Sequence, residues 1–418
     1  MEPITTGTYP KYRFVILGFL GFANILNVLM MLSLGILLPG ISEDLDLSPS
    51  EQGWLGSSAL LGALIFALPA SLWVSRFSAK TVLTAVLFFG AIFVSLQAWA
   101  PVFGVLILGR ILFGIAMVAR QPARVVLTIQ WFRPREIIIV NGVLLNVTFG
   151  LASVIGFVLT AYLLVWLDGS WRVALTIYSA VFLLIAVAWV IVGRERRSDA
   201  VEKTAGTDEG SPLRSLLRYR EMWYLGIGML GVSTMFGALI TFWPTLMLER
   251  HDISLTTSAT ILGISGIAEG IGGMAVSLYL VRAGRRDVRR PLVAFLAVLQ
   301  VASAIGMVSS GSVPALVGLG ILHGLGFAVA PIIFTVPFEL PGITYRELAV
   351  AAGFIEVSIR SGGVLGPLIA GFLQESTGDI QLSLVVTSLC ALSLVITAVT
   401  LFGKGSKRVT KSSALDTE

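Results

Sequence analysis

The sequence predicts an all-α membrane protein with twelve transmembrane helices in two parallel six-helix repeats. Composition is the first reason: 56% of the 418 residues are apolar and only 13% are charged, and the mean hydropathy is +0.90. The second is that apolar runs of about 18 to 28 residues recur along the chain, enough helix to cross a hydrocarbon core of roughly 30 Å. The third is a sequence pattern that occurs twice at a long, fixed distance.

The apolar runs are separated by charged or turn-forming residues. They lie at residues 14–39, 54–75, 81–99, 102–121, 137–164, 171–192, 222–247, 257–281, 291–309, 313–337, 348–373 and 381–402. Strands of a membrane β-barrel would be far shorter and would alternate apolar with polar residues. The runs therefore predict helices.

The repeated pattern relates the two halves of the chain. Residues 46–50 and 76–80 are echoed by residues 252–256 and 282–286, and both 252 − 46 and 282 − 76 give an offset of 206. Six runs precede the long hydrophilic connection and six follow it, so the halves are parallel repeats, an arrangement typical of transporters that hold a substrate between them. The expected organisation is an N-terminal half at 1–193, a cytoplasmic linker at 194–220, a C-terminal half at 221–403 and a cytoplasmic tail at 404–418.

Lys and Arg indicate the orientation, because they accumulate in cytoplasmic loops. With the N-terminus inside, most of the 29 Lys and Arg residues fall in cytoplasmic segments, among them Arg120 at the end of the fourth run and Arg124 just beyond it. We therefore expect a multi-pass protein of the cell (inner or plasma) membrane with both termini in the cytoplasm. The net charge of +5 then reflects topology and attraction to anionic lipid, so the lipid bilayer is an expected partner and nucleic acid is not.

The sequence lacks the residues that several kinds of site would need. Cys390 is the only cysteine, which excludes an intrachain disulfide and a cysteine-based metal site. No Gly-x-x-x-x-Gly-Lys-Ser/Thr segment occurs, so ATP hydrolysis by this chain is not expected. His323 is the one histidine inside a predicted span, and it supplies neither a nucleophile–base pair nor a metal cluster. We expect no enzymatic activity, no metal and no cofactor.

Three segments carry a resemblance to a known family. The basic turn after the second run has Ser71, Ser75, Arg76, Ser78 and Lys80, and its second copy has Ser277, Val281, Arg282, Gly284, Arg285 and Arg286. Residues 110–116 (RILFGIA) are similar to the pattern Arg-x-x-x-Gly-x-Gly-x-Ala of a fourth transmembrane helix, with Ala116 in the place of the second Gly. Residues 131–136 (WFRPRE) are similar to the pattern Trp-Phe-Pro-x-Arg-Glu. Together these segments resemble the major facilitator superfamily, twelve-helix secondary transporters, and the last is similar to its organic-anion and nitrate or cyanate type permeases.

The resemblance has implications for individual residues. It implies that the basic turns take part in the conformational cycle, through Arg76, Lys80, Arg282, Gly284 and Arg286. It also implies that Arg110, which stands at the position of the family's helix-four arginine, acts in proton coupling or in holding the site. From chemistry alone, the guanidinium of Arg110 could equally pair with a carboxylate such as that of Glu269 or of a substrate.

Two family patterns are missing. The antiporter pattern Gly-x-x-x-Gly-Pro is absent, because Gly156 is preceded four back by Ala152 and followed by Phe157. Drug exchange for protons is therefore less expected. The Gly-rich segment of the nitrate porters, with Asn at its centre, is also absent.

Five ionisable residues lie inside predicted spans, where a charge costs roughly 2.5 to 3.5 kcal/mol on insertion scales and usually faces an aqueous cavity or the bundle interior. They are Arg110, Glu269, His323, Glu356 and Arg360. At 1.5 Å per residue all five come to about 12 to 18 Å deep, near the membrane midplane. That level is where such transporters bind substrate between their halves.

We predict proton coupling by Glu269, since burial favours the neutral form of a carboxylate and lets it take up and release a proton. A permanently paired, structural carboxylate is the alternative. Glu356 and Arg360 are four residues apart, the spacing of an ion pair on one helical face, although Arg360 has donors to spare for an anionic substrate. His323 is a proton relay, a substrate donor or a satisfied interior imidazole.

The remaining candidates for substrate binding are uncharged and polar. They are Asn24, Asn27, Asn146, Thr241 and Trp243, which we group with Arg360 and Glu356. Hydrogen bonding between helices explains an intramembrane Asn equally well.

The sequence thus predicts a monomeric secondary transporter that moves a small organic anion with protons by alternating access. The alternative within transport is proton-coupled efflux of drugs or amphiphiles. A membrane sensor is a minor alternative, because the linker and tail are too short for an output domain.

Overall fold

The computed structural model describes residues 11–74, 76–195, 218–283, 289–340, 343 and 345–401, and this part of the chain is helical with no strand. The N-terminal set of helices comprises α1 (Arg13–Leu32), α2 (Leu34–Leu45), α3 (Pro49–Val74), α4 (Ala79–Ala98), α5 (Phe103–Val118), α6 (Arg120–Trp131), α7 (Pro134–Gly142), η1 (Val143–Val147), α8 (Thr148–Ser153), η2 (Val154–Leu159), α9 (Thr160–Trp166) and α10 (Trp171–Val192). The C-terminal set comprises α12 (Arg220–His251), α13 (Leu255–Ala283), α14 (Arg289–Ser309), α15 (Val313–Gly326), η4 (Phe327–Val329), α16 (Ala330–Thr335), η5 (Val336–Glu339), α17 (Tyr345–Thr377), α18 (Ile380–Leu389), η6 (Cys390–Leu392) and α19 (Ser393–Leu401).

Every predicted apolar run coincides with one or more of these helices. Within the described residues, ten helical stretches are long and apolar enough to cross a membrane. The two predicted spans outside those ten correspond to α3, of 26 residues, and α17, of 33 residues.

The sequence repeat is also a repeat of backbone structure. Asp46 and Asp252, equivalent in the two halves, both adopt the left-handed conformation, with φ of 50° and 53°, and end α2 and α12. Just beyond them, the hydroxyls of Ser48 and Ser254 each accept a backbone N–H three residues further on, at 3.3 Å. The same turn and the same N-cap chemistry therefore start the second long helix of each half.

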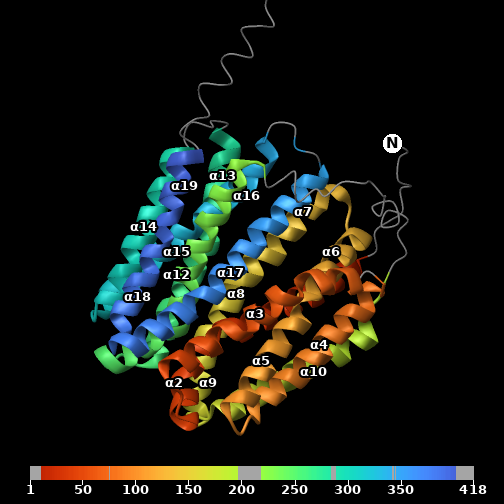
Figure 1. Ribbon diagram of the computed structural model, residues 1–418. Coiled ribbons are helices and arrows are strands. Elements are labelled where there is room, and N and C mark those ends of the chain that lie inside the picture. The colour runs from red at the N-terminus through yellow and green to blue at the C-terminus, as the bar shows by residue number, and fades with distance from the viewer. Residues whose placement is uncertain are drawn as a thin grey trace, which may run out of the picture.

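The two helix sets are joined at one end of the molecule. Figure 1 shows α2, α9 and α18 at the bottom and α6, α7 and α19 toward the top. We call the end with α2, α9 and α18 the distal end, and the end where α1 begins and α19 ends the proximal end. Contacts between the sets join α3 to α17, α2 to α12, and α13 to α8 and η2.

Glycines allow the sets to approach closely at the distal end. A Cβ on Gly35 of α2 would collide with the carbonyl oxygen of Ile240 in α12. A Cβ on Gly53 of α3 would lie 2.6 Å from the carbonyl oxygen of Pro367 in α17. Backbone therefore meets backbone across this contact, as small residues permit between membrane helices.

The basic turns lie at the proximal end. Arg76 and Arg282 are exposed, and the half-buried Lys80 has its carbonyl oxygen bound by the indole N–H of Trp189 at 3.2 Å. Gly284 and Arg286, which were predicted to act with them, lie outside the described residues.

An ion pair at the proximal end joins the start of α1 to the start of α7. Nη1 of Arg13 lies 2.9 Å from Oε2 of Glu136. The pKa of Glu136 is lowered from its usual 4.5, mainly by the backbone N–H of Arg133 and further by the charge of Arg13. A lowered folded-state pKa means that the ionised carboxylate stabilises the fold above the unfolded-state pKa and loses this effect as pH falls through the folded-state pKa.

We therefore expect Glu136→Gln to lower the apparent Tm slightly at pH 7.5 and by less at pH 3.5. Thermal unfolding of purified wild type and variant at both pH values measures the difference. The exposed Glu43 supplies the control, because Glu43→Gln should have no effect at either pH. A Tm difference for Glu136→Gln that is as large at pH 3.5 as at pH 7.5 would contradict the expectation.

Candidate functional site

A cavity between the two helix sets, here called the central cavity, is the main candidate site. Its polar lining comes from both sets: Asn27 of α1, Arg110 of α5, Arg120 and Gln121 of α6, Thr241 of α12 and Arg360 of α17. Apolar side chains complete the wall, among them Met30, Leu60, Phe113, Met117 and Ile240. The cavity thus combines an apolar wall with a few convergent polar groups, as small-molecule sites do.

Arg110 is buried in the wall of this cavity. Its side chain is 5% exposed, and its Nε has no hydrogen-bond partner. Among the described side chains no carboxylate forms an ion pair with it. A buried guanidinium without a carboxylate is costly, so this group is suited to bind an anion that enters the cavity.

Arg120 is a second buried guanidinium, which the sequence does not predict. The sequence predicts Arg120 and Arg124 in a cytoplasmic segment; the structure shows that residues 103–131 form one continuous helical stretch and that both residues are buried within the protein. Arg120 lines the central cavity, whereas Arg124 donates to Gln121 and Asn141 at 2.8 and 3.1 Å. Hydropathy does not predict this burial, because it counts a charged residue as solvent-exposed wherever the side chain points.

Asn24 holds Arg120 in place. Nη1 of Arg120 donates to Oδ1 of Asn24 at 2.7 Å. The amide nitrogen of Asn24 donates in turn to the carbonyl oxygen of Leu144, at 3.0 Å, and to the hydroxyl of Thr148. Asn27, and not Asn24, reaches the central cavity. The structure thus makes Asn24 a positioning residue.

Glu356 and Arg360 form the predicted ion pair. Nη2 of Arg360 lies 2.8 Å from Oε1 of Glu356, one turn earlier on α17. Arg360 also lines the central cavity, and its charge and that of Glu356 act on Arg120 across the gap between the sets. Cationic groups of both sets therefore face the same space.

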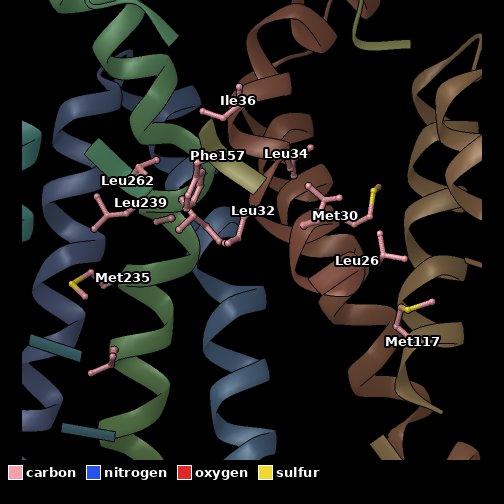
Figure 2. Close-up of a cluster of buried hydrophobic side chains, with 14 of the residues drawn as sticks. Leu26, Met30, Leu32, Leu34, Ile36, Met117, Phe157, Met235, Leu239 and Leu262 are labelled. Atoms are coloured by element: carbon pink, nitrogen blue, oxygen red, sulfur yellow. The ribbon is translucent and has the colours of Figure 1, made fainter. Parts of the chain in front are cut away.

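Glu269 and His323 line a different space, here called the side cavity. Phe149, Ser153, Phe157, Trp243 and Ser265 are also in its wall. Figure 2 shows the apolar packing around this region, with Leu32 and Phe157 of the N-terminal set beside Leu239 and Leu262 of the C-terminal set. Ile240 borders both cavities.

The side cavity is poor in partners for its ionisable groups. No described residue gives Glu269 a hydrogen bond or an ion pair. His323 is 5% exposed, its Nδ1 has no partner, and its ring packs edge-on against Phe327 at 5.4 Å. Of the five ionisable residues predicted to share one level, Arg110 and Arg360 line the central cavity, Glu269 and His323 line the side cavity, and Glu356 is in the lining of neither.

The uncharged candidates also separate. Thr241 lines the central cavity, and its hydroxyl donates to the carbonyl oxygen of Gly237 at 2.8 Å. Trp243 borders the side cavity, is fully buried and donates to the carbonyl oxygen of Met307 at 2.9 Å. The side chain of Asn146 lies outside the described residues.

Sequence reasoning missed Arg120 and Gln121 as cavity residues. No signal in the sequence marks them, because the continuity of α5 with α6 through the helical Ala119 is seen only in the structure. Within the described residues no group of three or more His, Cys, Asp or Glu is placed to hold a metal ion.

Comparison with known proteins identifies the family. The model of the Major Facilitator Superfamily matches residues 20–342. The chain is 23% identical to a hexuronate transporter of Bacillus subtilis (strain 168), covering 88% of this chain and 90% of the relative. It is 22% identical to a protein of Escherichia coli (strain K12) named a probable galactarate/D-glucarate transporter, covering 92% and 93%.

A solved structure shares the fold. The chain matches a bacterial homologue of the human lysosomal transporter Spinster, solved in an inward-facing, unoccupied conformation, with a TM-score of 0.74 and 16% identity over 95% of this chain and 97% of that one. Its likeness extends through both helix sets. The chain therefore belongs to the Major Facilitator Superfamily and is a multi-pass membrane transporter of small molecules, not an enzyme.

Proposed function

We propose that the protein is a secondary active transporter that carries a small organic anion of the sugar-acid type together with protons. The observation that supports this most directly is the cationic character of the central cavity. Arg110, Arg120 and Arg360 line it, and only Arg360 has a carboxylate partner among the described residues. Guanidinium groups bind carboxylates through paired, charge-assisted hydrogen bonds.

The relatives support the same class of substrate. Their names give hexuronate and galactarate or D-glucarate as the solutes carried. These are polyhydroxylated carboxylates, and the central cavity offers uncharged polar groups for the hydroxyls in Asn27, Gln121 and Thr241. In this proposal Arg110 and Arg360 bind carboxylate, and Glu356 keeps Arg360 oriented through their ion pair.

The arrangement of the two sets supports a mechanism of alternating access. Residues 1–193 and 221–403 move as two units joined by the linker 194–220, with the central cavity between them. The close glycine contacts at the distal end represent a state closed on that side. Both termini are cytoplasmic in this proposal, on the strength of the Lys and Arg distribution, and the basic turns with Arg76, Lys80 and Arg282 then face the cytoplasm.

Efflux of cationic drugs has less support. Such a site needs acidic groups against its ligand, and the acidic residues do not supply them: Glu269 lies in the side cavity and Glu356 is bound to Arg360. Among the described residues, no carboxylate is part of the central-cavity wall.

Uptake by proteoliposomes tests the proposed function. Protein reconstituted into vesicles should accumulate labelled D-galacturonate or galactarate when the outside is made acidic, and a protonophore should stop this accumulation. A cationic dye of similar size serves as the comparison solute. Transport of the dye without transport of either carboxylate would overturn the anion proposal.

Glu269 is our candidate for the proton-carrying group. It is half-buried and without a described partner, in a cavity whose other lining groups are mostly apolar. A carboxylate in such surroundings can change protonation as water gains and loses access to it. His323 lines the same cavity and is the second candidate.

We expect Glu269→Gln to abolish accumulation driven by a proton gradient while leaving substrate exchange between two sides of equal pH intact. The amide keeps the shape of the carboxylate but cannot take up a proton. Paired uptake and counterflow assays measure the two activities. Glu249→Gln, at the exposed end of α12, is the control, and undiminished proton-driven accumulation in Glu269→Gln would show the assignment to be wrong.

A further inference from the structure

The charges around the central cavity do not balance. Three guanidinium groups line it, from Arg110, Arg120 and Arg360, and the only carboxylate bound to any of them within the described residues is Glu356. Glu356 offsets one positive charge and leaves two. Uncompensated charge in a site of low polarity is expensive, so a ligand that restores neutrality is favoured.

The two unbalanced charges belong to Arg110 of α5 and Arg120 of α6, which lie on one continuous helical stretch. They are ten residues apart along α5 and α6, a separation of about 15 Å at 1.5 Å per residue. The helical path between them continues through Ala119, which has φ of −65°. Neither guanidinium acts on the other electrostatically, so a ligand with an anionic group at each end can meet each of them separately.

Arg120 is held ready for such a ligand. Asn24 accepts from its Nη1 at 2.7 Å and is itself fixed by Leu144 and Thr148. Asn24 is a neutral acceptor, so this contact orients the guanidinium without offsetting its charge. The buried Nε of Arg120 has no partner, and among the described residues of the opposite set only the ion pair of Arg360 with Glu356, whose two charges act on Arg120 with opposite signs, faces this group.

We propose that the central cavity is built for a dianion, a dicarboxylate of the aldarate type, with one carboxylate bound at Arg110 and the other at an anion subsite formed by Arg120. Monoanionic sugar acids leave the second charge unbalanced and bind more weakly. This inference depends on the proposed function, since it specifies the substrate of the same cavity. The second carboxylate also lies between Arg120 of the N-terminal set and Arg360 of the C-terminal set, and thereby offsets their mutual repulsion.

Binding measurements on the purified full-length protein test the charge of the ligand. Galactarate and D-galacturonate differ at one end, a carboxylate against an aldehyde-level carbon, and both are fully ionised at pH 7.5. We expect wild type to bind galactarate at least about tenfold more tightly, the value of one charge-assisted hydrogen-bonded contact. Equal or tighter binding of galacturonate would overturn the dianion proposal while leaving the proposed function standing; binding of neither ligand would reject both.

Variants of the subsite then test Arg120. Arg120→Gln should weaken galactarate binding by about tenfold or more and change galacturonate binding by less than about threefold. Arg124→Gln is the matched control, because Arg124 is one turn away on α6, is equally buried and does not line the cavity. Equal loss for both ligands in Arg120→Gln would mean a structural role for Arg120 and would overturn the subsite.

A second variant offsets the positive charge of Arg120 and leaves Arg120 itself in place. Asn24→Asp is nearly isosteric and places a carboxylate against the guanidinium, so it should reverse the preference from galactarate to galacturonate. Folding is checked by size-exclusion chromatography and thermal unfolding of the same samples. An unchanged preference for galactarate in Asn24→Asp would also contradict the proposal.

Discussion

Arg110→Gln is expected to abolish carboxylate binding to the central cavity and, with it, uptake of the anion. Truncating one partner of a buried, hydrogen-bonded charge pair typically costs about 2 to 5 kcal/mol, or roughly 30-fold to several thousand-fold in affinity. Arg110 belongs to this class because it is 5% exposed, lines the cavity and has no carboxylate partner among the described residues. Arg110→Lys keeps the charge but loses the planar fork, and its affinity should be intermediate.

Stability separates this effect from misfolding. A buried guanidinium without a carboxylate destabilises the empty protein, so Arg110→Gln should leave the apparent Tm unchanged or raise it. Calorimetric titration with galactarate and D-galacturonate, together with thermal unfolding, measures both quantities. Arg124→Gln should retain binding. A large fall in Tm for Arg110→Gln with undiminished affinity would assign Arg110 to the fold and not to the site.

Gly35→Leu is expected to prevent closure of the distal end and to reduce transport to a few per cent or less. The first added carbon would already collide with the carbonyl oxygen of Ile240 in α12. A backbone atom cannot be turned aside as a side chain can, so the two sets must separate to accommodate it. Overpacking of this kind costs typically about 1 to 3 kcal/mol, enough to reverse a balance between two conformations that differ by a few kcal/mol.

Cysteine accessibility measures the expected change. Cys390 is the only cysteine, so Cys390→Ser gives a background in which Asn27→Cys reports on the central cavity. An impermeant maleimide added on the distal side should label Asn27→Cys only when Gly35→Leu is also present. Gly18→Leu, on α1 with no atom within 4 Å of an added Cβ, is the control. Full transport by Gly35→Leu would show that this close contact is not needed.

Properties that depend on one helix at a time could be predicted from the sequence. Apolar length located the spans, and four-residue spacing located the ion pair of Glu356 and Arg360, because both are set by helix geometry alone. The resemblance of residues 46–50 to 252–256 extended even to the left-handed Asp46 and Asp252. Local chemistry in these places determines local structure.

Properties that depend on helix packing could not be predicted. Depth along the membrane normal is a single coordinate, and it placed both Arg110 and Glu269 near the midplane. Their separation into two cavities depends on how each helix is rotated against its neighbours. The burial of Arg120 depends on Asn24, 96 positions away in the sequence. No local pattern marks such a partner, so a charged helical segment was interpreted as a loop.

The glycine contacts at the distal end have a mechanical consequence. Surfaces that meet through backbone carry no long side chains that must be withdrawn from one another before the surfaces separate, and their parting uncovers little hydrocarbon to water. The same contact can therefore separate and re-form in every transport cycle without rearranging the packing within each helix set. The distal contact can then open without interlocked side chains being withdrawn, and the few kcal/mol released by one bound ion or solute can shift the balance between two conformations that differ by a similar amount.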